Sequence, residues 1–257
     1  MTAEAENKEA LFEYLLRLAD DRLIIGHRLS EWCGHGPILE EDIALANIAL
    51  DCIGQATNLL KLAGEVEGEG RSEDDLAYFR EAIDFRNLIM AELPKGDFAF
   101  TIARQFLFSA YSYLLLPKLA ESKYQPLAAQ AAKALKENQY HLRHCSEWML
   151  RLGDGTEESH QRVQKALEDL WMYTGEMFEE DDLQQKLVGE GVAVNSAELK
   201  PEWKKMVFDV ISKATLKLPD DDIYMISGGR HGRHSEHLGH LLSEMQILAR
   251  SFPGAKW

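Results

Sequence analysis

The stretch DIALANIALDCIGQATNLL, residues 42–60, is apolar on nearly every face of a helix, and so is FAFTIARQFLFSAYSYLLL, residues 98–116. Neither stretch alternates apolar and polar residues as a half-buried strand does, and both are far longer than a typical strand. We therefore predict two long buried helices here. The first should run from about residue 39 to 62, and we expect it to be the most buried helix of the chain.

Apolar residues at helical spacing continue on both sides of these two stretches. Asp97 and Thr156 stand where helix N-caps are expected, and Pro126 and Pro201 stand where a first helical turn accepts proline. Three segments are predicted to be loops or irregular, at 65–75, 189–200 and 219–233, with a short extended piece at 192–194. The remaining predicted helices cover 8–32, 76–85, the region near 87, 98–120, 126–152, 157–178, 201–216 and 235–252.

Four of these helices exceed five turns, and no linker rich in Pro, Gly or Ser divides the chain. Long helices joined by short loops are typical of an antiparallel bundle. We therefore predict an all-α fold, a long-helix bundle with additional peripheral helices, formed as one domain over residues 1–257. Residues 1–8 are expected to be a flexible N-terminus.

The charge and the cysteines restrict the classes of partner. The chain has 28 Lys and Arg against 43 Asp and Glu, a net charge of −15, which argues against nucleic-acid binding. Its three cysteines are far apart and form no C-x-x-C pair, as is usual in a reducing compartment. No uninterrupted apolar run reaches the ~18 residues of a membrane span, and the polar N-terminus does not resemble a signal peptide. We expect a cytoplasmic protein with no membrane partner.

Common catalytic motifs are missing from the sequence. It contains no G-x-x-x-x-G-K-[ST] phosphate loop, no G-x-G-x-x-G dinucleotide fingerprint after a strand, and no G-x-S-x-G nucleophile elbow. Cys33 and His35 are neighbours, but a turn explains that pair without nucleophilic chemistry. We predict no catalytic residue and no cofactor-binding residue in this chain.

A long-helix bundle suggests a di-iron site, which uses Glu-x-x-His pairs on two helices and a Glu on each of the other two. Of the nine histidines, only His160 follows an acidic residue, Glu157, at that spacing. That pair lies at the start of a predicted helix, beside a loop, and one match is no more than chance predicts. The search therefore predicts no metal ligands.

Two looser groups remain as alternatives for a metal ion. Glu137 and His141 are four residues apart on one helix face, and His237, His240 and Glu244 share a face of the last helix. Such groups are more often a buried polar network or a solvated face.

The segment GGRHGRHSEH, residues 228–237, combines two arginines with glycines ahead of a helix start. Arg230 and Arg233 could contact an anion or a partner there, because free backbone N–H groups converge at a helix N-terminus. The alternative is that both arginines pair with carboxylates of the chain itself.

Five segments carry a resemblance to a known family. They are LSEWCGHGP (29–37), DIALANIALDCIGQATNLL (42–60), FAFTIARQFLFSAY (98–111), KENQYHLRHCSEWMLRLGDGT (136–156) and GRHSEHLGHLLSEMQILARSFPGAKW (232–257). In order and over nearly the whole chain, they resemble the C-subunit family of bacterial ring-1,2-phenylacetyl-CoA epoxidase. The resemblance implies a ferritin-like all-α fold and a role in aerobic phenylacetate degradation.

The same resemblance implies a division of labour between subunits. The catalytic A subunit would carry the di-iron centre, and this chain would be its structural, non-catalytic partner in a hetero-oligomer with the other epoxidase subunits. In a ferritin-like register, the metal positions would hold Asp51 with Gly54 in place of histidine, Gln105, and Glu137 with Tyr140 in place of histidine. The resemblance thus implies a degenerate site filled by polar contacts, with no cofactor in this chain.

The leading hypothesis is therefore a structural subunit of a multicomponent monooxygenase, not catalytic by itself. The alternative is a self-sufficient metal-dependent oxidoreductase that uses the carboxylate and histidine groups named above. Under the leading hypothesis, Arg230 and Arg233 would touch either the partner subunit or the phosphates of coenzyme A.

Overall fold

The computed structural model describes residues 3–220 and 222–255, and within these the fold is all-α, without strands. It confirms a helical bundle with peripheral helices. The α-helices of the described residues are α1 (Ala3–Ser30), α2 (Leu39–Glu67), α3 (Glu73–Tyr78), α4 (Ile89–Glu92), α5 (Phe98–Leu119), α6 (Gln125–Gly153), α7 (Glu157–Trp171), α8 (Asp182–Gly189), α9 (Lys200–Lys213) and α10 (Glu236–Ser251).

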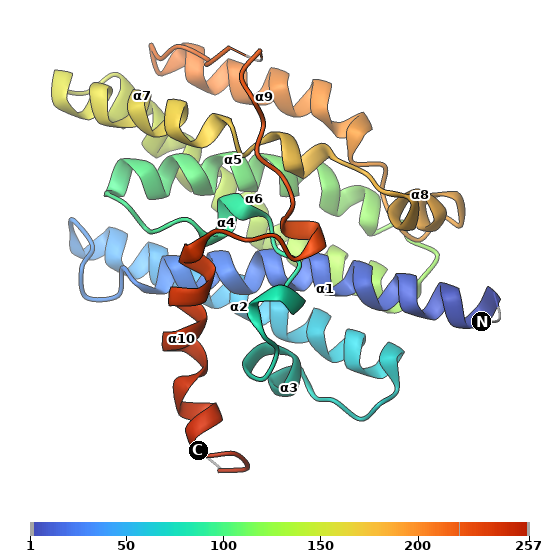
Figure 1. Ribbon diagram of the computed structural model, residues 1–257. Coiled ribbons are helices and arrows are strands. Elements are labelled where there is room, and N and C mark those ends of the chain that lie inside the picture. The colour runs from blue at the N-terminus through green and yellow to red at the C-terminus, as the bar shows by residue number, and fades with distance from the viewer. Residues whose placement is uncertain (1–2, 221, 256–257) are drawn as a thin grey trace.

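Four long helices, α1, α2, α5 and α6, form the bundle, in two pairs joined by short loops, α1 with α2 and α5 with α6 (Figure 1). Helices α7 and α9 cover one side of it. The segment after α9 runs back across the bundle to α10, which lies crosswise over α1. The chain's last helix is thereby brought against its first.

The predicted helix starts at Asp97, Thr156 and the two prolines are confirmed. The Asp97 side chain accepts a hydrogen bond from the Phe100 N–H at 2.9 Å, and the Thr156 hydroxyl accepts one from the Ser159 N–H at 3.2 Å. Prolines stand in the first turns of α6 and α9. These signals are local, since the caps bond N–H groups that a helix start leaves without a partner and proline lacks the N–H group there.

Several predicted boundaries are wrong. The helix expected at 76–85 starts earlier, at Glu73, because Ser72 and Asp75 form a capping box, and it ends at Tyr78. The helix expected to run from 157 to 178 ends at Trp171 and is followed by a separate 3₁₀ turn, Gly175–Phe178.

Other differences lie in shorter segments. Helix α8 was not predicted, and the extended piece expected at 192–194 forms no strand. Helix α1 begins at Ala3, so residues 3–8 of the segment expected to be flexible are helical. Residues 1 and 2 lie outside the described residues.

The expectation that the helix predicted at 39–62, which is α2, is the most buried helix is wrong. Buried residues make up 17 of 22 positions in α5 but only 12 of 29 in α2. Within the described residues, α2 is the one helix long and apolar enough to pass a length-and-composition test for a membrane span, with 44% of its most apolar window buried. Its inner face packs on α1 and α6, and its outer face leaves apolar side chains in solvent.

Candidate functional site

Three polar side chains meet between the long helices, each from a different helix. Arg22 of α1 is buried, and its Nε donates a hydrogen bond to Oε1 of Gln55 in α2 at 2.9 Å. Nε2 of Gln55 donates in turn to Oε2 of Glu137 in α6 at 2.8 Å. Burial lowers the pKa of Arg22 and the neighbouring Asp21 carboxylate opposes the shift, but a guanidinium keeps its proton in proteins. The chain of contacts thus places a positive charge inside the bundle.

Two histidines of α6 continue the polar layer toward one end of α2. His141 Nε2 lies 2.9 Å from Oδ2 of Asp51, and His144 Nε2 lies 2.8 Å from Oε2 of Glu41. His141 is buried, and Asp51 is half-buried at the edge of the bundle. The candidate pair Glu137 and His141 is therefore divided between two partners on α2.

Helix α5 contributes an amide and a hydroxyl to the bundle interior. Gln105 Nε2 donates to the Ser109 hydroxyl at 3.0 Å, and Asn138 of α6 donates to the Ser109 carbonyl oxygen at 3.0 Å. Gly54 and Tyr140, the positions assigned to missing histidines, both lie exposed at the surface. In each case the next residue reaches the other helix instead: Gln55 bonds Glu137 of α6, and His141 bonds Asp51 of α2.

This donor set does not fit a di-iron centre. Such a centre needs carboxylates from all four helices and imidazoles from two of them. Here Glu137 bonds the Gln55 amide, which in turn bonds the Arg22 guanidinium, and a fixed positive charge repels a metal dication at short range. Within residues 3–220 and 222–255, no group of three or more His, Cys, Asp or Glu side chains is placed to hold a metal ion.

The other metal alternative lies on α10. His237 is half-buried, and its carbonyl oxygen accepts a hydrogen bond from Nη2 of Arg28 in α1 at 3.0 Å. His240 and Glu244 are exposed on the outer face of α10.

Arg230 lies inside the molecule and is committed to the chain's own groups. Its two terminal nitrogens bond both carboxylate oxygens of Asp21, at 2.9 and 2.8 Å, and Nη1 also donates to the Arg86 carbonyl oxygen at 2.8 Å. Burial opposes the charge on Arg230, but the Asp21 carboxylate outweighs it and raises the pKa of Arg230. Arg233, in contrast, is exposed. Of the two arginines, Arg233 alone presents its side chain to solvent.

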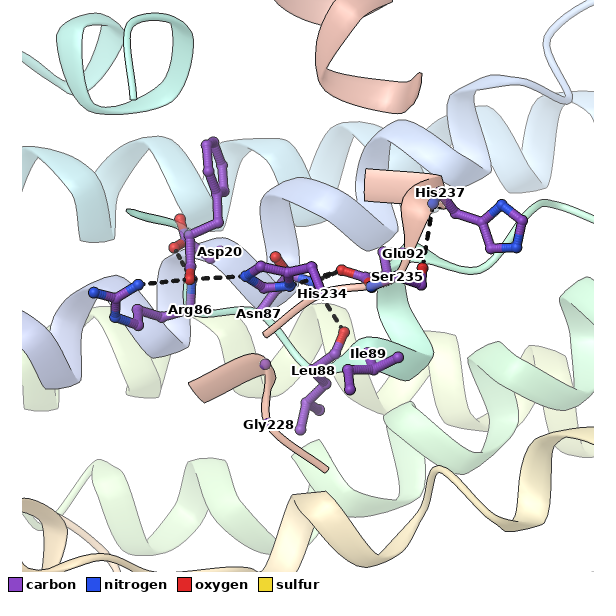
Figure 2. A network of polar contacts seen from close by, with 12 residues as sticks. Asp20, Arg86, Asn87, Leu88, Ile89, Glu92, Gly228, His234, Ser235 and His237 are labelled. Carbon is purple, nitrogen blue, oxygen red and sulfur yellow. Dashed lines mark hydrogen bonds and ion pairs between the residues drawn. The ribbon is translucent and has the colours of Figure 1, made fainter. Parts of the chain in front are cut away.

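A second polar network ties the 228–237 segment to the loop before α5 (Figure 2). The fully buried Glu92 accepts hydrogen bonds from His234 Nδ1 at 2.9 Å, the Ser235 N–H at 2.5 Å and Asn87 Nδ2 at 3.1 Å. His234 Nε2 lies 3.0 Å from the Phe85 carbonyl oxygen. Burial disfavours charged His234, but the bond and charge of Glu92 raise its pKa overall.

Further carboxylates of the same region are satisfied in the same manner. Glu176 accepts from the backbone N–H groups of Ile89, Gly228 and Gly229, at 2.8, 2.9 and 2.6 Å. Asp20 forms a two-point ion pair with Arg80 and accepts from the Arg86 N–H at 2.8 Å. The Glu176 contacts hold the segment before α10 against α4 and the 3₁₀ turn Gly175–Phe178, and the Asp20 contacts hold the segment between α3 and α4 against α1.

Sequence reasoning missed the buried acids Asp20, Asp21, Glu92 and Glu176. The periodicity of the first helix places Asp20 and Asp21 on outer faces, whereas both are essentially inaccessible to solvent. The available signal was the run LADDRLII, residues 18–25, in which three adjacent charges interrupt an apolar helix. Such a run indicates buried ion pairs when partners exist elsewhere in the chain.

Comparison with known proteins agrees with this architecture. The family model described as phenylacetic acid catabolic protein matches residues 1–257. The chain is 48% identical over 247 residues to the C subunit of the 1,2-phenylacetyl-CoA epoxidase of Escherichia coli (strain K12), covering 96% of this chain and 99% of that protein. The chain therefore belongs to the family of phenylacetic acid catabolic proteins.

Proposed function

We propose that this chain is the structural, non-catalytic subunit of a multicomponent phenylacetyl-CoA epoxidase in phenylacetate catabolism. The observation that carries the proposal is the hydrogen-bonded chain Arg22–Gln55–Glu137, because it places a buried guanidinium next to the amide that bonds Glu137, a group that a metal site between these helices would use. The redox chemistry would then reside in a partner of related fold, the di-iron A subunit. Three cysteines without a disulfide and a coenzyme A thioester substrate both favour the cytoplasm.

The outer face of α2 is our candidate for the surface that contacts the A subunit. Leu39, Ile43 and Leu50 lie on this face with 72%, 53% and 67% of their surface exposed. Apolar side chains aligned along a helix and left in solvent mark protein interaction sites. A permanent complex typically buries about 2,000 Å² or more, so neighbouring parts of α6 would also be covered.

Support at this surface would be mechanical. A rigid bundle packed against the catalytic bundle keeps the metal-bearing helices from moving apart, and ligand geometry tolerates only about 0.5 Å of error. The buried ion pairs of α1 and the hydrogen bonds around Glu92 would make this subunit rigid.

The test is co-purification with a tagged A subunit from the same pathway. We expect the unaltered chain to be retained. Ile43→Glu should reduce retention at least about tenfold, equivalent to ~1.4 kcal/mol. Phe208→Glu should be retained like the unaltered chain. Phe208 is a matched control because it is 52% exposed and lies on α9, away from α2. Equal losses of retention in both variants would exclude α2 as the surface that contacts the A subunit.

A second assay tests the non-catalytic role directly. The chain alone, supplied with ferrous iron, oxygen and a reductant, should not convert phenylacetyl-CoA, whereas addition of the A subunit and reductase should restore conversion. Turnover by the chain alone would overturn the proposal and favour a self-sufficient oxidoreductase.

A further inference from the structure

A cavity of about 210 Å³ lies among α1, α2, α5 and α6, next to the polar chain of Arg22. Most of its wall is apolar. The apolar side chains that surround it include Leu18, Leu59, Leu116, Leu119, Leu127 and Ala131. An enclosed cavity of about 150 Å³ with wholly apolar walls is sufficient to bind benzene, so this larger and partly polar cavity has room for a single substituted ring.

The cavity wall also carries polar side chains, and one hydrogen-bond donor among them makes no bond to a described residue. The hydrogen bonds of the Arg22 guanidinium to described residues come from Nε and Nη1, which leaves Nη2 for the cavity that Arg22 lines. The Arg22 side chain is buried, with only 3% of the residue exposed. A donor that faces the cavity without a protein acceptor is satisfied either by water or by a ligand that brings an acceptor of its own.

The charges around the cavity select against an ion. Asp51 and Glu137 would repel a carboxylate, while Arg22 and Lys133 would repel an ammonium group. Because the two positive and two negative side chains balance each other, neither a carboxylate nor an ammonium group gains net electrostatic attraction from the cavity wall. An uncharged molecule with one acceptor atom satisfies Arg22 without facing a like charge.

The mouth of the cavity opens through the surface between α2 and α6, beside Leu50, Gly54 and Lys133, all of which are exposed. A Cβ atom added to Gly54 would have no other atom within 4 Å. Position 54 therefore has room for a larger side chain at the edge of the cavity, where it would narrow the opening without colliding with the protein.

We propose that this cavity is a binding site for a small, uncharged, mainly apolar molecule of single-ring size that carries one hydrogen-bond acceptor. The apolar wall would hold the ring, and Arg22 Nη2 would donate to the acceptor. This site is separate from catalysis and does not depend on docking of the A subunit, although the α2 face that contains its mouth would be covered in a complex.

The test measures binding of benzyl alcohol to the isolated full chain by ligand-observed NMR, with benzoate and benzylamine as charged probes of the same size. We expect benzyl alcohol to bind at least about tenfold more tightly than either ion, a difference of ~1.4 kcal/mol. Gly54→Leu should weaken the binding of benzyl alcohol by a similar factor. Gly239→Leu is the matched control, since Gly239 is also an exposed helical glycine with no atom near an added Cβ.

Circular dichroism and thermal unfolding establish that both variants are folded before binding is compared. Absence of benzyl alcohol binding at millimolar concentration would mean that the cavity holds water only and would overturn the proposal. Equal weakening by Gly54→Leu and Gly239→Leu, or tighter binding of benzoate, would also overturn it. Loss of A-subunit retention in the co-purification assay has no bearing on these results, because the binding assay contains only this chain.

Discussion

Arg230 and Asp21 form a two-point ion pair between positions 209 residues apart, with both N···O distances at or below 2.9 Å. The Asp21 side chain is 2% exposed and that of Arg230 is 15% exposed. We expect Arg230→Ala to lower the free energy of unfolding by about 3–5 kcal/mol, because it leaves a buried carboxylate without its counter-charge. Urea unfolding followed by circular dichroism measures this change.

Arg162→Ala is the matched control for that experiment. Arg162 forms ion pairs with the carboxylates of Glu158 and Asp97, whereas Arg230 pairs with one, and Arg162 lies on the exposed face of α7. Its removal should leave the urea midpoint unchanged within error, since exposed ion pairs contribute little. A similar loss in both variants would mean that burial does not set the importance of the Arg230 pair.

His234 makes stability depend on pH. Its folded-state pKa is raised above the unfolded value of about 6.5, so its contribution is fully present below that value and is lost as pH rises through the folded pKa. Between about pH 6 and about pH 8.5, the unaltered chain should lose more stability than His234→Gln does. Urea midpoints at the two pH values measure this, with His35→Gln, a change at an exposed histidine, as the control.

Equal pH slopes for the unaltered chain and His234→Gln would show that the His234–Glu92 contact carries no proton linkage. If stability falls more steeply with pH in His234→Gln than in His35→Gln, the pH dependence belongs to His35 and the prediction for His234 is wrong.

Two glycines of α2 should respond to alanine with opposite signs. A Cβ at Gly64 would collide with the Arg71 carbonyl oxygen, so Gly64→Ala should destabilise the chain by about 1–3 kcal/mol. A Cβ at Gly54 meets open space, so Gly54→Ala should stabilise it by about 0.5–1 kcal/mol through helix propensity alone. Thermal unfolding of the two variants side by side tests both. Shifts of the same sign would contradict the packing around Gly64.

Metal content tests the interpretation of the bundle interior. After anaerobic loading with ferrous iron and desalting, we expect well below one iron atom per chain, because Arg22 lies among the groups that would have to bind it. Elemental analysis gives the number. Close to two atoms per chain, lost in Glu137→Ala, would mean that a real metal site exists despite the guanidinium.

The long helices were predictable because their signals are local. The Asp97 and Thr156 caps and the first-turn prolines each act within one turn, and apolar periodicity fixes which stretches are helical. The short segments were less predictable. The end of α7 at Trp171 and the presence of α8 depend on packing against residues far away in the chain, which periodicity does not report.

The bundle interior was predictable only in kind. Glu137, Asp51 and His141 do take part in a polar network, as the search for metal ligands suggested they could. The decisive residue, Arg22, was not singled out, because an arginine within a helix usually reaches solvent. Arg22 is buried because α2 and α6 pack over its side chain, and only the tertiary fold brings these two helices there.

The pairing of α1 with the segment before α10 also has a consequence for how the chain is made. Asp21 leaves the ribosome 209 residues before its counter-charge at Arg230 does. Until then, closing the bundle would bury an unpaired carboxylate, which costs several kcal/mol. Closing the bundle around α1 is therefore favoured only after residue 230 has been made, and a fragment that stops before it lacks the counter-charge of Asp21.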